Sequence, residues 1–121
     1  MLKKPITYTD YDGVERTEDF YFNLTKAELM EWEFAETGGL KAKLEKIIAS
    51  KDVPAIAKTF KEIITKAYGV KSDDGKRFIK NQEVLDAFTQ SEAYSELYME
   101  LATNEDAATK FINAVIPKVQ A

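Results

Sequence analysis

The sequence predicts an α+β fold that is mainly helical, with an N-terminal β-hairpin followed by a bundle of about six short helices. Residues 5–22 are rich in Thr, Tyr, Val and Phe, which favour strands, and Asp12-Gly13 interrupts them as a hairpin turn would. From Leu24 onward, helix-start signals recur, and residues 53–68 place apolar side chains at spacings of three and four. We expect a single domain over residues 1–121, with the hairpin at 1–23 and a helical body at 24–121.

The two strands of the hairpin are predicted at residues 5–11 and 14–22. Gly13 can adopt the positive φ that a two-residue type I′ turn requires. Alternation along the second strand places Phe20 and Phe22 on one face and Tyr21 on the other. Because an isolated hairpin is only marginally stable in water, we expect the phenylalanine face to pack on the helices.

The first helix has a well-defined start. Thr25 and Glu28 have the spacing of a capping box, and Leu24 and Leu29 have the spacing of a hydrophobic staple. We expect this helix to end at Gly38-Gly39. A short second helix follows, and its apolar stripe consists of Leu40, Leu44, Ile47 and Ile48.

The third helix, predicted at residues 53–68, has the clearest amphipathic pattern and is expected to be central to the core. Asp52 is its predicted N-cap, Pro54 lies in its first turn, and Gly69 is its predicted terminator. The next segment, residues 70–80, is polar around Asp74-Gly75. It is compatible either with a loop or with a second small hairpin.

Three further helices are predicted in the C-terminal third. Asn81 is the predicted N-cap of the first, Ser91 of the second, and Thr103 or Asn104 of the third. Pro117 is expected to close the last helix.

Composition excludes several classes of protein. The chain has no cysteine, which removes disulfides and thiolate chemistry and favours a reducing compartment. The start, MLKKPITYTD, lacks the apolar segment of a signal peptide, and no apolar run approaches the roughly 20 residues of a membrane span. We therefore expect a cytoplasmic protein that does not enter a membrane.

Charge is distributed unevenly along the chain. The net charge of −4 argues against general binding to nucleic acid. Residues 1–37 carry a net charge of −5, residues 38–80 of +6, and residues 81–121 of −5. In one interpretation the basic middle packs beside the acidic ends; in the other, one charged face steers an oppositely charged protein partner.

No catalytic, cofactor-binding or metal-binding residues are predicted. Histidine and cysteine are absent, so the commonest general base and transition-metal ligands are missing. The run from Ser72 to Gly75 is similar to the start of a calcium loop but lacks the downstream glutamate, and we interpret it as a polar turn. Glu96 and Glu100 are spaced as a solvated helix face rather than as an acid–base pair.

The C-terminal helices carry a large apolar surface for their length. Tyr and Phe are usually core residues but are also favoured at binding hot spots, so an apolar groove on these helices is a candidate partner site. The predicted partner-binding residues are Phe88, Tyr94, Tyr98, Phe111 and Val115.

Most of the chain resembles tail assembly chaperones of long-tailed phages that infect Gram-positive bacteria. The resemblance rests on Gly69-Val70-Lys71, residues 74–78, Ala87-Phe88, residues 92–94, Glu96-Leu97 and residues 111–113, together with Tyr11-Asp12-Gly13 and residues 24–28. It implies a protein without enzymatic activity that binds the phage tape measure protein and keeps it soluble while tail tube subunits assemble around it. It also implies a place in the host cytoplasm and absence from the mature virion.

Several points stay open within this hypothesis. The resemblance implies that a longer product is often made by ribosomal frameshifting, which a protein sequence cannot reveal. Tail tube subunits are a second candidate partner, and self-association is a further alternative. The rival function is that of a structural head–tail connector or tail completion protein of the virion.

Overall fold

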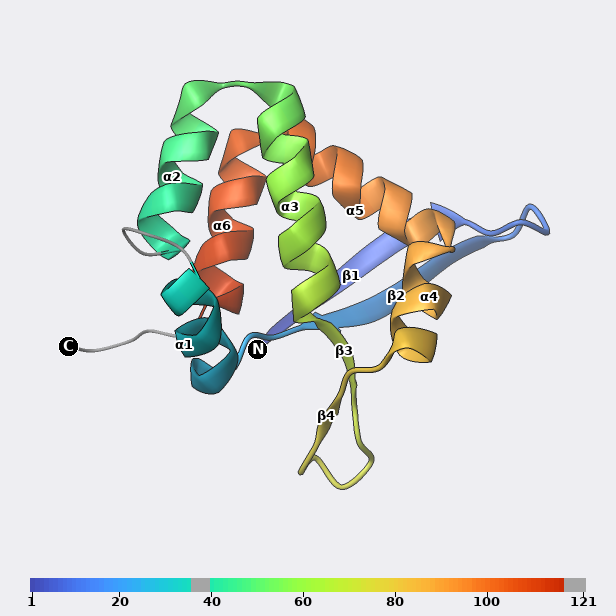
Figure 1. Cartoon of the computed structure of the whole chain (residues 1–121). Helices are drawn as coiled ribbons and strands as arrows, with labels where there is room; N and C mark the ends of the chain where they lie inside the picture. Colours follow the sequence, from blue (N-terminus) through green and yellow to red (C-terminus); the bar gives the residue numbers. More distant parts are fainter. Residues whose placement is uncertain (36–39, 117–121) are drawn as a thin grey trace.

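The computed structural model describes residues 1–35 and 40–116, which form four strands and six helices (Figure 1). This confirms the predicted mainly helical α+β fold. The predicted helix stop at Gly38-Gly39 and the predicted closing residue Pro117 lie outside the described residues. The elements, in chain order, are β1 (Leu2–Thr9), β2 (Glu15–Phe22), α1 (Lys26–Ala35), α2 (Leu40–Ser50), α3 (Val53–Ala67), β3 (Tyr68–Lys71), β4 (Phe78–Ile79), α4 (Gln82–Thr89), α5 (Glu92–Thr103) and α6 (Glu105–Val115).

The strands form one antiparallel sheet in the order β1-β2-β3-β4. The first hairpin pairs Leu2 with Phe22 at its base and Thr9 with Glu15 near its tip. β2 continues the sheet through only a short pairing with β3, in which Phe22 lies opposite Tyr68. The second small hairpin at residues 70–80 is therefore present, and the region predicted as a helical body also contributes β3 and β4.

The tip of the first hairpin differs from the prediction. The strands end at Thr9 and resume at Glu15, so a five-residue connection replaces the two-residue turn. The Asp10 carboxylate accepts hydrogen bonds from the backbone N–H groups of Asp12 and Val14, each at 2.9 Å. Gly13 has a φ of 81°, which suits glycine. Asp10 thus stabilises a longer loop that the Asp-Gly pair alone does not specify.

Three of the predicted helix caps are confirmed. The Thr25 hydroxyl accepts from the Glu28 N–H at 3.1 Å, and the Glu28 carboxylate accepts from the Thr25 N–H at 2.9 Å, which completes the capping box. Asp52 and Asn81 each accept a hydrogen bond from the backbone N–H three residues later. These local contacts satisfy N–H groups that a helix start leaves without partners.

The caps of the last two helices differ in detail from the prediction. Ser91 occupies the N-cap position of α5, but its hydroxyl donates to the Phe88 carbonyl at 2.6 Å and does not cap α5. Of the two candidates for α6, Asn104 is the cap and accepts from the Ala107 N–H at 3.1 Å. The Thr103 hydroxyl instead donates to the backbone of α5.

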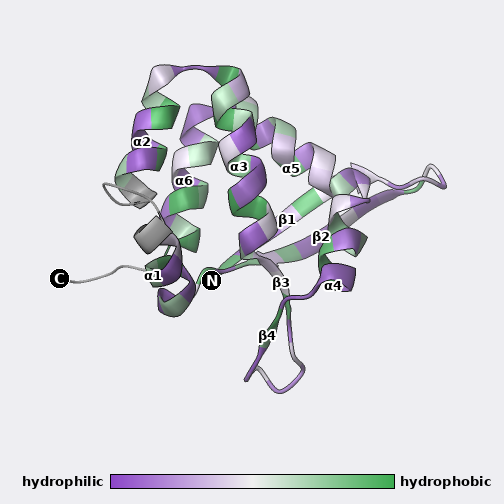
Figure 2. Cartoon of the chain, in the orientation of Figure 1, coloured by the Kyte–Doolittle hydropathy of each residue, from purple (hydrophilic) through white to green (hydrophobic). Residues whose placement is uncertain are grey.

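The core forms around α3, as predicted. This helix buries Ile56, Phe60, Ile63, Ile64 and Ala67, and it packs against α2 and α5. Figure 2 shows apolar and polar residues alternating around α2 and α3. The predicted role of Gly69 is wrong: α3 ends at Ala67, and Gly69 is a buried residue of β3.

Helices cover one face of the sheet. In β1 the even-numbered residues Leu2, Ile6 and Tyr8 pack against the core, whereas the odd-numbered residues are exposed. α5 crosses this inner face, and the Lys4 ammonium donates to the Glu100 carboxylate of α5 at 3.0 Å. The far half of the hairpin projects beyond the helices (Figure 1), which leaves its tip open to solvent.

Candidate partner-binding surface

An aromatic cluster joins the sheet to the C-terminal helices. Tyr68 of β3 stacks on Phe88 of α4, with ring centroids 4.4 Å apart and planes 20° apart. Phe20 and Phe22 of β2 contact the same Phe88 ring at 5.2 and 5.7 Å between ring centroids. Offset and tilted ring contacts of this kind stabilise a core beyond simple burial. The cluster therefore fixes where α4 and α5 lie on the sheet.

The five predicted partner-binding residues fall into two groups. Phe88, Phe111 and Val115 are buried and belong to the hydrophobic core, so they contact no partner in this conformation. Tyr94 and Tyr98 are half-buried neighbours on α5, with ring centroids 5.8 Å apart. The structure brings Phe88 against Tyr94 at 5.7 Å, so Tyr94 stands on a buried support.

The hydroxyl groups of Tyr94 and Tyr68 stay protonated near neutral pH. Burial raises the pKa of Tyr94, and the neighbouring Tyr98 raises it further. Burial likewise raises the pKa of Tyr68, with a smaller effect from Glu18. Near neutral pH this part of the surface is therefore uncharged and can pack or donate hydrogen bonds.

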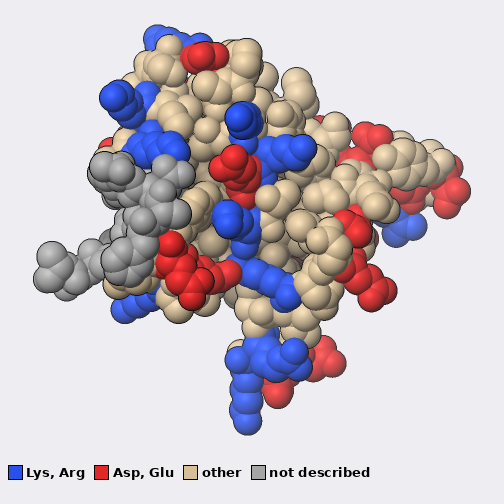
Figure 3. All heavy atoms as spheres, in the orientation of Figure 1, with Lys and Arg blue, Asp and Glu red and all other residues tan. Residues whose placement is uncertain are grey.

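Charged side chains separate over the surface. Lysines follow α2 and α3, and acidic side chains gather on the tip of the first hairpin (Figure 3). The Lys80–Glu28 ion pair, at 2.7 Å, joins the basic middle of the chain to an acidic end. Lys58 and Lys61 of α3, in contrast, are exposed. Internal pairing and exposed lysines therefore coexist, and the steering of an oppositely charged partner stays a prediction.

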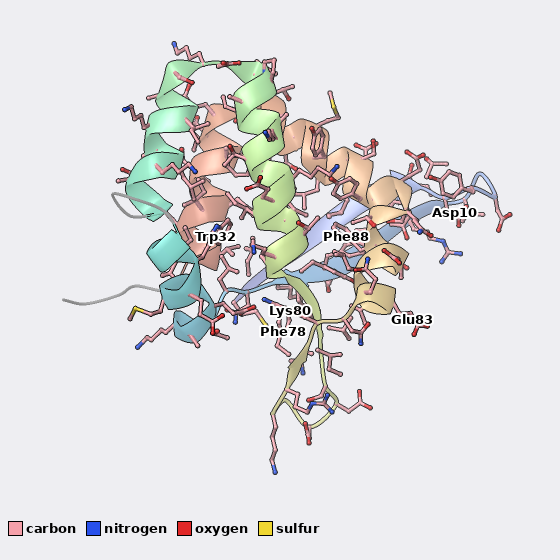
Figure 4. All side chains as sticks on the ribbon, viewed as in Figure 1. Asp10, Trp32, Phe78, Lys80, Glu83 and Phe88 are labelled. Carbon is pink, nitrogen blue, oxygen red and sulfur yellow. The ribbon has the colours of Figure 1, made fainter. Side chains whose placement is uncertain are left out.

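Lys80 connects four elements at the base of the second hairpin (Figure 4). Its ammonium group donates to the Asn23 carbonyl at 2.8 Å, the Lys66 carbonyl at 2.7 Å and the Glu28 carboxylate at 2.7 Å. These acceptors belong to the end of β2, the last turn of α3 and the first turn of α1. The contact is structural, because it uses all three protons of the ammonium group.

We expect Lys80→Met to lower the free energy of unfolding by about 1–2 kcal/mol at neutral pH, because two carbonyls and a partly exposed carboxylate lose their donor. Burial alone raises the pKa of Glu28, but hydrogen bonds from Lys80 and Thr25 outweigh it and lower the pKa below 4.5. The Glu28 carboxylate thus contributes its full stabilisation above its ordinary pKa. This contribution disappears as the pH falls through the lower folded-state pKa.

Urea unfolding of both proteins at neutral pH, and again below the folded-state pKa of Glu28, measures this effect. The difference between Lys80→Met and the natural chain should shrink in acid. A difference of the same size at both values would mean that Glu28 takes no part in the contact. The exposed Lys58→Met on α3 is the matched control and should leave stability nearly unchanged.

The acidic motifs singled out in the sequence have structural partners. The Asp74 carboxylate accepts from the Ser72 hydroxyl at 2.6 Å and the Lys76 N–H at 3.0 Å, which is the geometry of a polar turn. Glu96 is exposed, whereas Glu100 is bound by Lys4 rather than solvated alone. Within residues 1–35 and 40–116 no group of three or more acidic side chains could hold a metal ion. None of the helices in these ranges is long and apolar enough to cross a bilayer.

The structure also exposes apolar residues that the sequence did not single out. Tyr11 at the hairpin tip is 76% exposed, and Met30, Val53 and Met99 are each about half exposed. Tyr11 lies beside a predicted turn, and Val53 directly follows an N-cap. Residues beside a turn or directly after an N-cap point away from the core. This placement is the only sequence signal that could have identified Tyr11 and Val53 as exposed.

Two hollows lie near the C-terminal helices. A 250 Å³ pocket between the α2–α3 and α5–α6 corners is mainly apolar and is lined by residues that include Ile48, Val53, Ile56, Leu101 and Ala108. A 500 Å³ groove separates β1 from the α5–α6 corner and has charged walls, with Lys3, Glu100 and Lys110 among them. The first is smaller than most small-molecule sites, which favours a protein side chain as its occupant.

Comparison with known proteins identifies the family. Neither the curated proteins nor the solved structures contain a match to this sequence. The family model described as phage tail assembly chaperone matches residues 1–120. That match covers nearly the whole chain, including both hairpins and all six described helices. The chain therefore belongs to the phage tail assembly chaperone family, whose function is not enzymatic.

Proposed function

We propose that this chaperone binds the tape measure protein of its phage and keeps that protein soluble while the tail tube assembles. Membership of the tail assembly chaperone family carries the proposal. We further propose that the phage is long-tailed and infects a Gram-positive bacterium, and that the protein acts in the host cytoplasm and is absent from the virion.

The surface is compatible with reversible capture of a client. Exposed apolar side chains such as Met30 and Met99 provide contact area, while the net charge of −4 favours solubility. Binding of the unassembled client alone shifts its equilibrium away from aggregation and requires no nucleotide.

The client site in this proposal centres on Tyr94 and Tyr98. Both are half-buried on α5; Tyr94 rests on Phe88 and Tyr98 lies beside Tyr94, so the pair offers large apolar area at low entropic cost. Phe88 supports Tyr94 from below, whereas Phe111 and Val115 are core residues of α6. All three would contact the client directly only if the C-terminal helices separate. Tail tube subunits are a second candidate client for the same surface.

Co-expression with the tape measure protein tests the function. We expect more soluble tape measure protein and co-elution of the two proteins on size exclusion. Tyr98→Ser should weaken the complex at least about tenfold, as loss of a hot-spot aromatic does. Tyr21→Ser, a half-buried tyrosine on the opposite sheet face, is the matched control and should bind normally.

The outcomes separate function from site. Absence of any complex with the tape measure protein would contradict the proposed function. If the complex forms as well with Tyr98→Ser, the proposed function would stand and the proposed client site would be wrong. Mass spectrometry of purified virions addresses the rival: a connector or completion protein is present in the particle, whereas an assembly chaperone is missing.

A further inference from the structure

The tip of the first hairpin is an exposed apolar knob on a well-ordered loop. Tyr11 is 76% exposed and Val14 is 51% exposed, and the hairpin that carries them projects beyond the helices (Figure 1). The Tyr11 hydroxyl donates a hydrogen bond to the Glu92 carboxylate at the start of α5. Asp10 accepts two backbone hydrogen bonds from the loop and is paired with Arg16, which restrains the tip. Large apolar side chains held in one conformation lose little entropy when they bind.

The apolar pocket at the two helix corners has the size to receive such a knob. Its volume is 250 Å³, and a dry cavity of about 150 Å³ already accommodates a benzene ring. Val53 is 51% exposed and lines the pocket beside the buried side chains of Ile56 and Leu101. The pocket thus presents apolar surface that the single chain leaves partly open.

The pocket wall carries one basic and one acidic residue, Lys51 and Glu105. Lys51 lines it and has a φ of 58°, the one non-glycine residue with positive φ in the described part of the chain. Lys51 directly follows the last residue of α2, where a left-handed residue commonly ends a helix, although lysine adopts this conformation less readily than glycine. Its positive charge complements the exposed carboxylates of Asp12 and Glu15 near the tip of the hairpin.

We propose that the hairpin tip of one copy docks in this pocket of a second copy, with the Tyr11 ring inserted beside Val53 and the Asp12 carboxylate near Lys51. Knob and pocket lie on different parts of the same chain, so the contact is heterologous and repeats head to tail. A contact of one loop and one pocket is small, which makes the association weak and reversible. This inference is independent of the proposed client.

Sedimentation velocity of the full chain over a concentration series measures the association. We expect reversible oligomers that weaken as salt rises. Tyr11→Ser removes the knob, and Val53→Asp places a repelling carboxylate at the pocket in the first turn of α3, where the helix dipole tolerates it. Each variant should reduce the association constant at least about tenfold. Met30→Ser, which removes an equally exposed apolar side chain outside the pocket, is the control.

Mixing the two defective variants tests the head-to-tail geometry. Tyr11→Ser retains an intact pocket and Val53→Asp retains an intact knob, so an equimolar mixture should give a 1:1 dimer that does not grow further. Two-fold symmetric self-association through another surface would give no such rescue. Lys51→Gly adds a separate readout: relief of the positive φ should raise Tm by about 3–5 °C while association weakens.

Three results would overturn the inference. The natural chain could remain monomeric at every concentration and salt. Association could persist unchanged in both Tyr11→Ser and Val53→Asp. Lys51→Gly could associate as well as the natural chain while being more stable, which would leave the strained lysine without a role in the contact.

Discussion

Replacing Phe22 by alanine is expected to lower the free energy of unfolding by about 3–5 kcal/mol, a large share of the total stability of a small domain. The Phe22 side chain is completely buried, and its ring lies 5.3 Å from that of Phe111 and 5.7 Å from those of Tyr68 and Phe88. Alanine would leave a cavity where β2, β3, α4 and α6 meet, and no neighbouring element can move into it without losing its own contacts.

Urea unfolding followed by the fluorescence of Trp32 measures this effect. Tyr21→Ala, one position earlier on the opposite face of β2, is the matched control and should cost less than about 1 kcal/mol. A loss at Phe22 no greater than that of the control would mean that the aromatic cluster does not hold the sheet to the C-terminal helices.

Gly69→Val is expected to cost about 3 kcal/mol, because β3 has no room for a side chain at this position. A Cβ atom on Gly69 would lie 2.6 Å from Cε2 of the Phe78 ring and 2.9 Å from the carbonyl oxygen of Ile79. Both atoms belong to β4, which pairs with β3 directly. The substitution therefore forces the two strands apart or displaces the ring.

A double-mutant cycle with Phe78→Ala tests this cause. Phe78→Ala removes the closest atoms but leaves the Ile79 carbonyl, so the double variant should regain part of the loss, and the coupling should be favourable. Val70→Ala, at an exposed neighbouring position of β3, is the control. Additive effects of Gly69→Val and Phe78→Ala would contradict a steric origin.

Local rules predicted the helices well. The capping residues Thr25, Glu28, Asp52 and Asn81 make the expected hydrogen bonds, because a cap involves groups only three residues apart. The apolar spacing of residues 53–68 likewise predicted the central helix, because the periodicity of one buried helix face can be recognised from that segment alone.

Long-range packing explains what local rules missed. Gly69 was interpreted as a helix terminator, but it is required because Phe78 lies over it, a contact that depends on strand pairing. Phe88, Phe111 and Val115 were interpreted as partner-binding residues, yet Phe22 of β2 lies against Phe88, Phe60 of α3 lies against Phe111, and Val115 is buried in the core. Periodicity identifies an apolar face but does not say whether that face meets the rest of the chain or another protein.

The candidate surface could be predicted only in part for the same reason. Tyr94 and Tyr98 remain accessible because α5 lies at the border of the aromatic cluster, a fact set by the tertiary arrangement. The exposure of Tyr11 follows from the Asp10-centred loop, which replaced the shorter turn that the Asp-Gly pair suggests.

The position of β3 beside β2 has a consequence for the order of folding. The first hairpin closes a short loop, so β1 and β2 can pair early in synthesis, but their neighbour in the sheet arrives only after α1, α2 and α3. During that interval the side of β2 that later pairs with β3 has no strand beside it and can recruit a foreign strand. The helices that separate β2 from β3 in sequence thus set how long a nascent chain is vulnerable to misassembly.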